Sequence, residues 1–180
     1  MGLRRLVAVR VVHCPHSFAL VLEGAKGWKL VYSGDTRPCP QLVRASEGAT
    51  VVIHEATFDD GMRIEVRRWP RPGPKAPGGT HRDPQPQADK KRHSITREAV
   101  RVGSEAGAYR TLLTHFSQRY PKIPVFDASF QSNTCIAFDM MTVSLQDLPR
   151  LPRLLPSLAE FFKEEVPADD KAEAIPVMFD

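Results

Sequence analysis

Three residues whose side chains bind metal ions stand at widely separated positions of the chain: His13, Asp35 and His115. Each follows a short apolar stretch typical of a β-strand, so all three can lie on loops at one edge of a sheet. Imidazole and carboxylate groups suit zinc, and a carboxylate can bridge two ions. An isolated histidine after a strand is more often a surface or core residue, and Asp35 also fits a turn. Spacing alone therefore leaves both interpretations open.

Glu55 and His93 form a second pair of candidate residues. A histidine that is oriented by a carboxylate can give a proton to a leaving oxygen. Glu55 closes an apolar, β-branched stretch, and His93 precedes a helix-like segment. A surface glutamate and a histidine at the start of a helix fit the same pattern, so the pair by itself does not decide between catalysis and structure.

The residues around these positions form motifs whose order along the chain is informative. In this order the chain resembles ribonuclease Z, the metallo-β-lactamase-type endonuclease that trims tRNA precursors at the 3′ end. The likeness is closest to the C-terminal half of the long, eukaryotic form, and it covers residues 7 to 162 apart from one insertion. The motifs are Val12-His13-Cys14, Tyr32-Ser33-Gly34-Asp35-Thr36, His54-Glu55-Ala56-Thr57, His93-Ser94, Leu113-Thr114-His115-Phe116-Ser117-Gln118-Arg119-Tyr120 and Ala137-Phe138-Asp139-Met140.

The resemblance implies a role for each candidate residue in a site with two Zn²⁺ ions. His13 matches a ligand of one zinc ion, His115 matches a ligand of the other, and Asp35 matches the carboxylate that bridges them. Glu55 and His93 match the pair that gives a proton to the leaving 3′ oxygen. The implied substrate is precursor tRNA, and the implied reaction removes the 3′ trailer and leaves a 3′-hydroxyl on the tRNA.

The sequence also departs from the family pattern. It contains no His-x-His-x-Asp-His box, which supplies the remaining zinc ligands in the family, and no recognisable substrate-clamping arm. Three ligands shared by two ions fall short of the three protein ligands usual for one catalytic zinc. We therefore expect a missing N-terminal half or a second chain to complete the site, and we expect this chain alone to be inactive or very weak.

Two further residues match positions near the family site. Arg119 follows His115 closely and can contact a substrate phosphate, although a solvated surface position fits it equally well. Asp139 lies in the Ala-Phe-Asp-Met motif, and the end of a strand fits it equally well. Both are predicted as weak substrate-binding residues.

Composition sets broad limits on the class of protein. A length of 180 residues fits one domain or part of one, and 42% hydrophobic residues can support a core. The net charge of +4 is compatible with nucleic-acid binding but does not require it. Three cysteines without a CxxC pair fit a reducing compartment. The sequence has no apolar run long enough to span a bilayer, so we expect no membrane association.

The order of strand-like and helix-like stretches predicts an α/β fold, and the resemblance implies the C-terminal portion of a metallo-β-lactamase-like αββα sandwich. Residues 24–27 are predicted to turn a hairpin, Ser94 to be a helix N-cap, and Gly107 to be a C-cap. Strands are expected at residues 6–12, 18–22, 28–32, 50–53, 111–113 and 135–143, and helices at 40–45, 94–106 and 154–162.

The predicted domain organisation has four parts. Residues 1–62 and 93–162 form the metallo-β-lactamase-like domain, residues 63–92 form a disordered basic insertion, and residues 163–180 form an acidic tail. The insertion is rich in proline and glycine and has almost no apolar side chains, so it cannot offset the entropy of ordering. Both an insertion without a role and an electrostatic contact with RNA phosphates remain open.

The sequence leaves three functions to be distinguished. They are the catalytic part of a tRNA 3′-processing endonuclease, a non-catalytic RNA- or partner-binding relative, and a different hydrolase that acts on small esters. The HEAT and HFSQRY motifs argue against the third. The nucleus, the mitochondrion and the cytoplasm are all open as compartments. Arg4, Arg5 and Arg10 precede the first acidic residue as in a mitochondrial presequence, but the β-branched run through residues 6–12 favours a strand.

Overall fold

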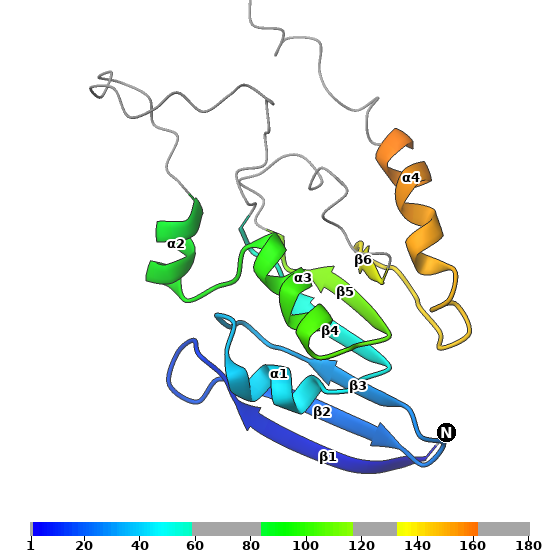
Figure 1. Ribbon diagram of the computed structural model, residues 1–180, viewed down its shortest axis with the longest axis horizontal. Helices are drawn as coiled ribbons and strands as arrows, with labels where there is room; N and C mark the ends of the chain where they lie inside the picture. Colours follow the sequence, from blue (N-terminus) through cyan, green and yellow to red (C-terminus); the bar gives the residue numbers. More distant parts are fainter. Residues whose placement is uncertain (1, 59–83, 117–132, 162–180) are drawn as a thin grey trace, which may run out of the picture.

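The computed structural model describes residues 2–58, 84–116 and 133–161, and these form one six-stranded mixed sheet with helices against it (Figure 1). The strands are β1 (Leu3–Arg10), β2 (Phe18–Gly24), β3 (Lys29–Tyr32), β4 (Val51–Glu55), β5 (Arg110–Thr114) and β6 (Thr134–Ile136). The helices are α1 (Pro40–Ser46), α2 (Pro84–Lys91), α3 (Thr96–Glu105) and α4 (Leu151–Phe161). The predicted α/β fold class is therefore confirmed.

The strands lie in sequence order across the sheet, and their directions bring several strand ends to one edge. β1, β2 and β3 pair in antiparallel fashion, and β3, β4, β5 and β6 pair in parallel. β1 consequently runs in the same direction as β3 to β6. The loops that follow β1, β3, β4 and β5 all leave the sheet at the same edge, and these loops carry His13, Asp35, Thr57 and His115.

The hairpin between β2 and β3 forms as the sequence predicts. The Gly27 N–H donates to the Gly24 carbonyl, and Gly27 has a φ of +82°, a conformation that glycine adopts without strain. Gly24 also has no room for a side chain, because a Cβ there would lie 2.0 Å from the Trp28 ring.

One face of the sheet is covered by α1 and α3, which lie across it in Figure 1. Aliphatic side chains, most of them valines, fill this layer, among them Val21, Val31, Leu42, Val52 and Val102. In α3, Gly103 allows the helix to approach β5, because a Cβ at that position would lie 2.0 Å from the Thr111 hydroxyl. The packing fixes the height of α3 above the sheet and with it the position of His93 just before the helix.

The opposite face is covered only in part by the described residues. The loop before α4 and the start of α4 pack on the β4–β6 side, through a cluster of Val51, Leu112, Cys135, Leu148 and Leu151. On the β1–β3 side, Leu6, Leu20 and Tyr32 are 58%, 38% and 43% exposed. These three side chains occupy neighbouring register positions, since Leu6 pairs with Leu22 and Leu20 pairs with both Ala8 and Tyr32.

The strand predicted at residues 135–143 is much shorter in the structure, where β6 ends at Ile136. The Ala137 N–H still donates to the Leu113 carbonyl, but the partner strand β5 ends one residue later, at Thr114, and His115 has a φ of +63°. No further β5 residue is therefore available to pair with a longer β6, and the chain turns away at Met140, which has a φ of +62°.

The predicted N-cap of α3 is also wrong. The helix begins at Thr96 with Ile95 as N-cap, and the Glu98 carboxylate accepts the Ile95 N–H. The Ser94 hydroxyl donates to the Thr36 carbonyl instead, so this residue links the helix start to the β3 loop. At the other end the C-cap is Ala106, one residue before the predicted Gly107, and Gly107 follows it with a φ of +61°.

Part of the predicted disordered insertion forms helix α2, so that expectation is wrong for residues 84–91. The helix is held by its contacts with the domain: Ala88 is buried against Phe58 and Ile95, and the Asp89 carboxylate pairs with Arg37 at 2.9 Å. Composition missed these few anchoring residues. Residues 63–83 of the insertion and the tail 163–180 lie outside the described residues. Among the described residues, no helix is long and apolar enough to cross a membrane.

Candidate metal and proton-transfer site

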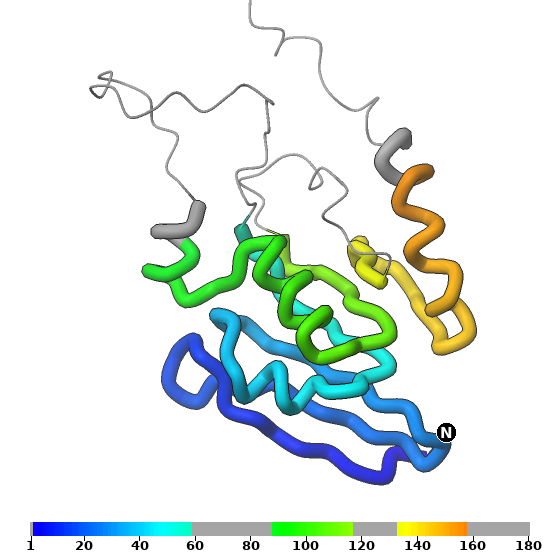
Figure 2. The backbone as a smooth tube through the Cα atoms, viewed as in Figure 1, coloured from blue at the N-terminus to red at the C-terminus, as the bar shows by residue number. Residues whose placement is uncertain are grey.

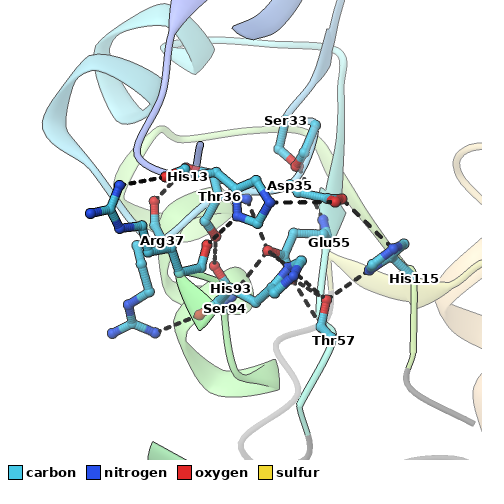
Figure 3. A network of polar contacts seen from close by, with 12 residues as sticks. His13, Ser33, Asp35, Thr36, Arg37, Glu55, Thr57, His93, Ser94 and His115 are labelled. Atoms are coloured by element: carbon cyan, nitrogen blue, oxygen red, sulfur yellow. Dashed lines mark hydrogen bonds and ion pairs between the residues drawn. The ribbon is translucent and has the colours of Figure 1, made fainter. Parts of the chain in front are cut away.

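Asp35 lies between two histidines that come from distant parts of the chain. Its Oδ2 atom is 4.0 Å from His13 Nε2, and its Oδ1 atom is 3.7 Å from His115 Nε2. The two carboxylate oxygens therefore face two different imidazole nitrogens (Figure 3). The side chains of His13, Asp35 and His115 are 21%, 38% and 50% exposed, so the group is accessible from solvent.

The sequence supplies these positions through the loops at the sheet edge. His13 follows β1, and its loop is joined to the β3 loop by the pairing of Val12 with Arg37. His115 directly follows β5 and has a φ of +63°, a left-handed conformation that is uncommon for histidine. The surrounding hydrogen bonds hold this conformation, which turns the ring toward Asp35.

His13 is held by the segment that follows α2. Its Nδ1 atom is 2.9 Å from the Arg92 carbonyl oxygen, and Arg92 Nη1 donates to the His13 carbonyl at 2.7 Å. A carbonyl can only accept, so His13 Nδ1 is the donor and its Nε2 is left to face Asp35. Figure 2 shows the loop after β1 in blue next to the green segment around residue 92.

The Glu55 carboxylate is 2% exposed and is surrounded by donors. Its Oε1 atom accepts from the backbone N–H groups of Thr36 and Ser94 at 2.9 and 3.1 Å. Its Oε2 atom accepts from the N–H and hydroxyl groups of Thr57 at 3.0 and 2.7 Å. Buried charge is tolerated where backbone donors satisfy it, and this set of donors fits an ionised carboxylate. With both oxygens accepting hydrogen bonds, Glu55 is held in place and can orient neighbouring groups.

His93 stands beside Glu55 and between the other two histidines. Its Nδ1 atom is 3.0 Å from Glu55 Oε1, and its ring centroid is 4.6 Å from that of His13 and 5.6 Å from that of His115. His93 contributes to both groups of potential metal ligands among the described residues, one with His13 and Asp35 and the other with Glu55 and His115. Because Nδ1 is bound to Glu55, Nε2 is the atom of His93 that faces the site.

Arg37 ties three segments of the site together. Its guanidinium donates to the His93 carbonyl at 2.8 Å and to both Glu98 oxygens at 2.5 and 2.7 Å. It also pairs with Asp89 of α2 at 2.9 Å. Two parallel bonds from guanidinium to carboxylate are strong and fix the angle between the groups. The loop that carries Asp35 is thus joined, through Arg37, to the backbone of His93.

His54 precedes Glu55 in the HEAT motif but has a different environment. It is fully buried, its Nδ1 donates to the Glu55 carbonyl at 2.6 Å, and its Nε2 has no hydrogen-bond partner among the described residues. Burial lowers the pKa of His54 below the usual histidine value. His54 is therefore neutral near pH 7 and supports the strand rather than taking part in proton exchange.

The structure brings together five of the predicted site residues, namely His13, Asp35, Glu55, His93 and His115. Asp139 is exposed in the loop after β6, and none of the contacts among the described site residues involves it. Arg119 lies outside the described residues. Four further site residues were not predicted, although each lies within or directly after one of the sequence motifs: Thr36, Arg37, Thr57 and Ser94.

Known proteins resemble this chain in both sequence and fold. The chain is 49% identical over 176 residues to the mitochondrial tRNase Z TRZ4 of Arabidopsis thaliana, an alignment that covers 92% of this chain and 16% of that protein. It is 40% identical over 156 residues to the human zinc phosphodiesterase ELAC protein 2, covering 87% of this chain and 16% of that protein. The chain belongs to the ribonuclease Z family.

Solved structures place this ribonuclease Z chain within a larger fold. A long-form ribonuclease Z from yeast superposes with a TM-score of 0.68 at 27% identity, over 91% of this chain and 20% of that one. The human short-form tRNase Z superposes with a TM-score of 0.54 at 26% identity, over 78% of this chain and 42% of that one. These neighbours confirm that the described fold is shared with part of solved ribonuclease Z structures. No family model matches the chain.

The curated relatives are far longer than this chain. The chain spans 16% of the length of TRZ4 and 18% of the length of the related tRNase Z TRZ3 of Arabidopsis thaliana.

Proposed function

We propose that this chain supplies one part of the zinc site of a tRNA 3′-processing endonuclease. The observation that carries the proposal is the position of Asp35, whose two oxygens face His13 and His115 at 4.0 and 3.7 Å. A single carboxylate between two imidazoles is suited to a bridge between two metal ions. The names of the relatives, which include tRNase Z and zinc phosphodiesterase, support both the metal and the substrate class.

The residues present fit zinc in chemistry and in spacing. Two ligand atoms about 2.1 Å from one tetrahedral zinc ion lie about 3.4 Å apart, close to the two spacings around Asp35. His13 and Asp35 would hold one ion, and His115 and Asp35 would hold the other. Bound zinc would stabilise negative charge on the phosphate and activate a water molecule at neutral pH. Each ion still needs further ligands, which we assign to a His-x-His-x-Asp-His segment outside this chain.

The proton for the leaving group comes from His93 in this proposal. Glu55 accepts from His93 Nδ1 at 3.0 Å, which stabilises the imidazolium and directs Nε2–H toward the site. Nε2–H then donates its proton to the 3′ oxygen as the phosphodiester bond breaks, and this gives the tRNA its 3′-hydroxyl. Arg37 holds the backbone of His93 during this transfer through the His93 carbonyl.

The exposed side of the sheet supports the requirement for more protein. Leu6, Leu20 and Tyr32 form an apolar surface over β1–β3 that the described residues leave open to solvent. Neighbouring exposed apolar side chains can mark a surface that another polypeptide covers. We propose that the polypeptide with the His-x-His-x-Asp-His segment packs on this surface, either as a longer chain or as a second chain.

We propose the mitochondrion as the compartment, because the two Arabidopsis relatives are named as mitochondrial. Arg4 and Arg5 belong to β1, which pairs with β2, so in the folded chain they are part of the sheet. Imaging of the tagged protein together with mitochondrial and nuclear markers tests this assignment, and an exclusively nuclear signal contradicts it.

Cleavage of a precursor tRNA with a labelled 3′ trailer tests the proposed activity. We expect no measurable cleavage by the 180-residue chain with zinc, and cleavage once a polypeptide with the His-x-His-x-Asp-His segment is added. The restored activity should be lost in His115→Ala. Cleavage by the chain alone that disappears in His115→Ala overturns the requirement for a second segment. Tight RNA binding without cleavage in the completed assembly favours a non-catalytic relative.

A further inference from the structure

Thr57 is the residue that connects the two parts of the site. Its hydroxyl oxygen lies 2.7 Å from Glu55 Oε2, 2.7 Å from His115 Nδ1 and 3.2 Å from His93 Nδ1. The side chain is almost fully buried, with Thr57 9% exposed, so water does not replace these contacts. We propose that Thr57 is a positioning residue that fixes the tautomer and the ring orientation of His115.

The register of the sheet places Thr57 at this point. Glu55 pairs with Thr114 at the end of the parallel β4–β5 ladder, and the Ala56 N–H continues the pairing by donating to the Thr114 carbonyl. In this register Ala56 lies opposite His115, so Thr57 stands one residue further along, close enough for its hydroxyl to reach the His115 ring. On its other side, the pairing of Phe58 with Ile95 brings the segment before α3 close to it. The backbone alone therefore brings the Thr57 hydroxyl between two imidazole rings.

A proton count assigns the direction of each bond. A threonine hydroxyl has one hydrogen to donate and two lone pairs that accept. A carboxylate only accepts, so the single hydroxyl hydrogen goes to Glu55 Oε2. His115 Nδ1 must then be the donor in its 2.7 Å contact with Thr57. In neutral His115 the hydrogen stands on Nδ1, and the Nε2 lone pair faces Asp35 Oδ1.

The result resembles the arrangement at His13, which is reached by different means. There the Arg92 carbonyl accepts from Nδ1, and Nε2 again faces Asp35. Metal-binding histidines commonly donate their other ring nitrogen to an oxygen acceptor, and loss of that acceptor weakens metal binding 10- to 100-fold. Thr57 additionally bonds to Glu55, so one hydroxyl orders both the Asp35 side and the His93 side of the site.

The inference rests on the proposed function only in its assignment of His115 as a zinc ligand. The tautomer itself can be measured without metal, by the imidazole ¹⁵N chemical shifts of the metal-free 180-residue chain at a pH where His115 is neutral. We expect the Nδ1–H form for His115 in the wild-type chain and in Thr57→Ser, which keeps the hydroxyl. Thr57→Val keeps the shape and the backbone N–H but has no acceptor, and we expect it to shift toward the Nε2–H form.

Thr96→Val is the matched control. It also removes a buried threonine hydroxyl, which donates to the Phe58 carbonyl at 3.3 Å, but the contacts of His115 do not involve it. We expect the wild-type tautomer in this variant. Zinc affinity of the assembly that also contains the His-x-His-x-Asp-His segment, measured by competition with a chromophoric chelator, should fall 10- to 100-fold in Thr57→Val and stay within 3-fold of wild type in Thr57→Ser.

Each result bears on the proposal in a defined way. A wild-type chain with His115 in the Nε2–H form overturns it without any substitution, and so does a folded Thr57→Val chain that keeps the Nδ1–H form. If Thr57→Val does not fold, the wild-type tautomer and its retention in Thr57→Ser decide the question. The predicted tautomers together with no zinc binding by the assembly that contains the His-x-His-x-Asp-His segment support Thr57 as a positioning residue and contradict the zinc assignment.

Discussion

The two parts of the candidate site differ in how their charges are stabilised. Glu55 and His93, the Glu55 pair, are nearly buried and joined to each other and to backbone donors by hydrogen bonds of 2.9–3.1 Å. Asp35 with His13 and His115, the Asp35 group, is more exposed, and its members face one another across 3.7–4.0 Å. The Glu55 pair is completed by this chain, whereas the spacing of the Asp35 group fits ligands around ions.

The comparison predicts opposite effects of removing one charge from each part. In Glu55→Gln, an amide N–H₂ replaces one of the acceptor oxygens that now faces backbone N–H donors. We expect a loss of about 3 kcal/mol in the free energy of unfolding of the metal-free chain, because buried donors lose their partner. Urea unfolding monitored by circular dichroism measures this effect.

Asp35→Asn is the control for that measurement. The Asp35 side chain is 38% exposed, and the imidazole nitrogens of His13 and His115 that face it lie at 4.0 and 3.7 Å, beyond hydrogen-bond distance. The metal-free stability should change by less than about 0.5 kcal/mol, whereas zinc affinity should fall strongly. Equal losses of stability in the two variants would show that the two parts do not differ in the way described.

Arg37→Lys tests the connection between the two parts. Lysine keeps the charge but cannot make two parallel bonds to Glu98 while also reaching the His93 carbonyl. We expect a loss of about 1–2 kcal/mol in the free energy of unfolding and a displaced imidazole resonance of His93. Arg101→Lys alters an exposed pair with Glu105 and should leave both quantities unchanged. An unshifted His93 resonance in Arg37→Lys argues that the arginine does not position His93.

The buried HEAT segment should make stability depend on pH. Burial lowers the pKa of His54 in the folded chain, so the unfolded chain binds an additional proton below about pH 6.5. Stability is then fully present above pH 6.5 and falls as the pH is lowered, with a limiting slope of about 1.4 kcal/mol per pH unit from this residue. His54→Asn keeps a donor for the Glu55 carbonyl but has no such proton, so its stability between pH 7 and pH 5 should fall less steeply. Parallel curves for the two proteins contradict the assignment.

Thiol labelling distinguishes an exposed loop from the buried core without any amino-acid substitution. Cys14 is exposed beside His13, whereas Cys39 and Cys135 are buried, and burial raises the pKa of Cys135 to about 11. We expect iodoacetamide at pH 8 to modify Cys14 first, as read by peptide mass spectrometry. Modification of Cys135 at a similar rate would show that the β6 edge opens under native conditions.

Much of the fold could be predicted from the sequence because its signals are local. The β-branched runs and the Gly24–Gly27 turn predicted β1 to β5 within a few residues, and glycine after α3 marked the end of that helix. The length of β6 could not be predicted this way. It depends on where its partner strand β5 ends, and β5, which ends at Thr114, is distant in sequence from β6.

Helix α2 illustrates the same limit in the opposite direction. Its sequence is poor in apolar residues, and local composition favoured disorder. One buried alanine, Ala88, and one ion pair, between Asp89 and Arg37, anchor it to distant segments. Contacts of this kind leave no periodic pattern in the sequence, so composition cannot reveal them.

The sequence by itself determined which residue types are available for chemistry, the order of the motifs and the family to which they belong. Only the tertiary structure decided how those residues divide into two parts with different stabilisation. Glu55 is enclosed by donors from Thr36, Thr57 and Ser94, which meet only when the β3, β4 and α3 segments pack together. Hydrogen bonds act over about 3 Å. The partners of a side chain, and hence its tautomer and charge, are therefore set by which segments fold against one another.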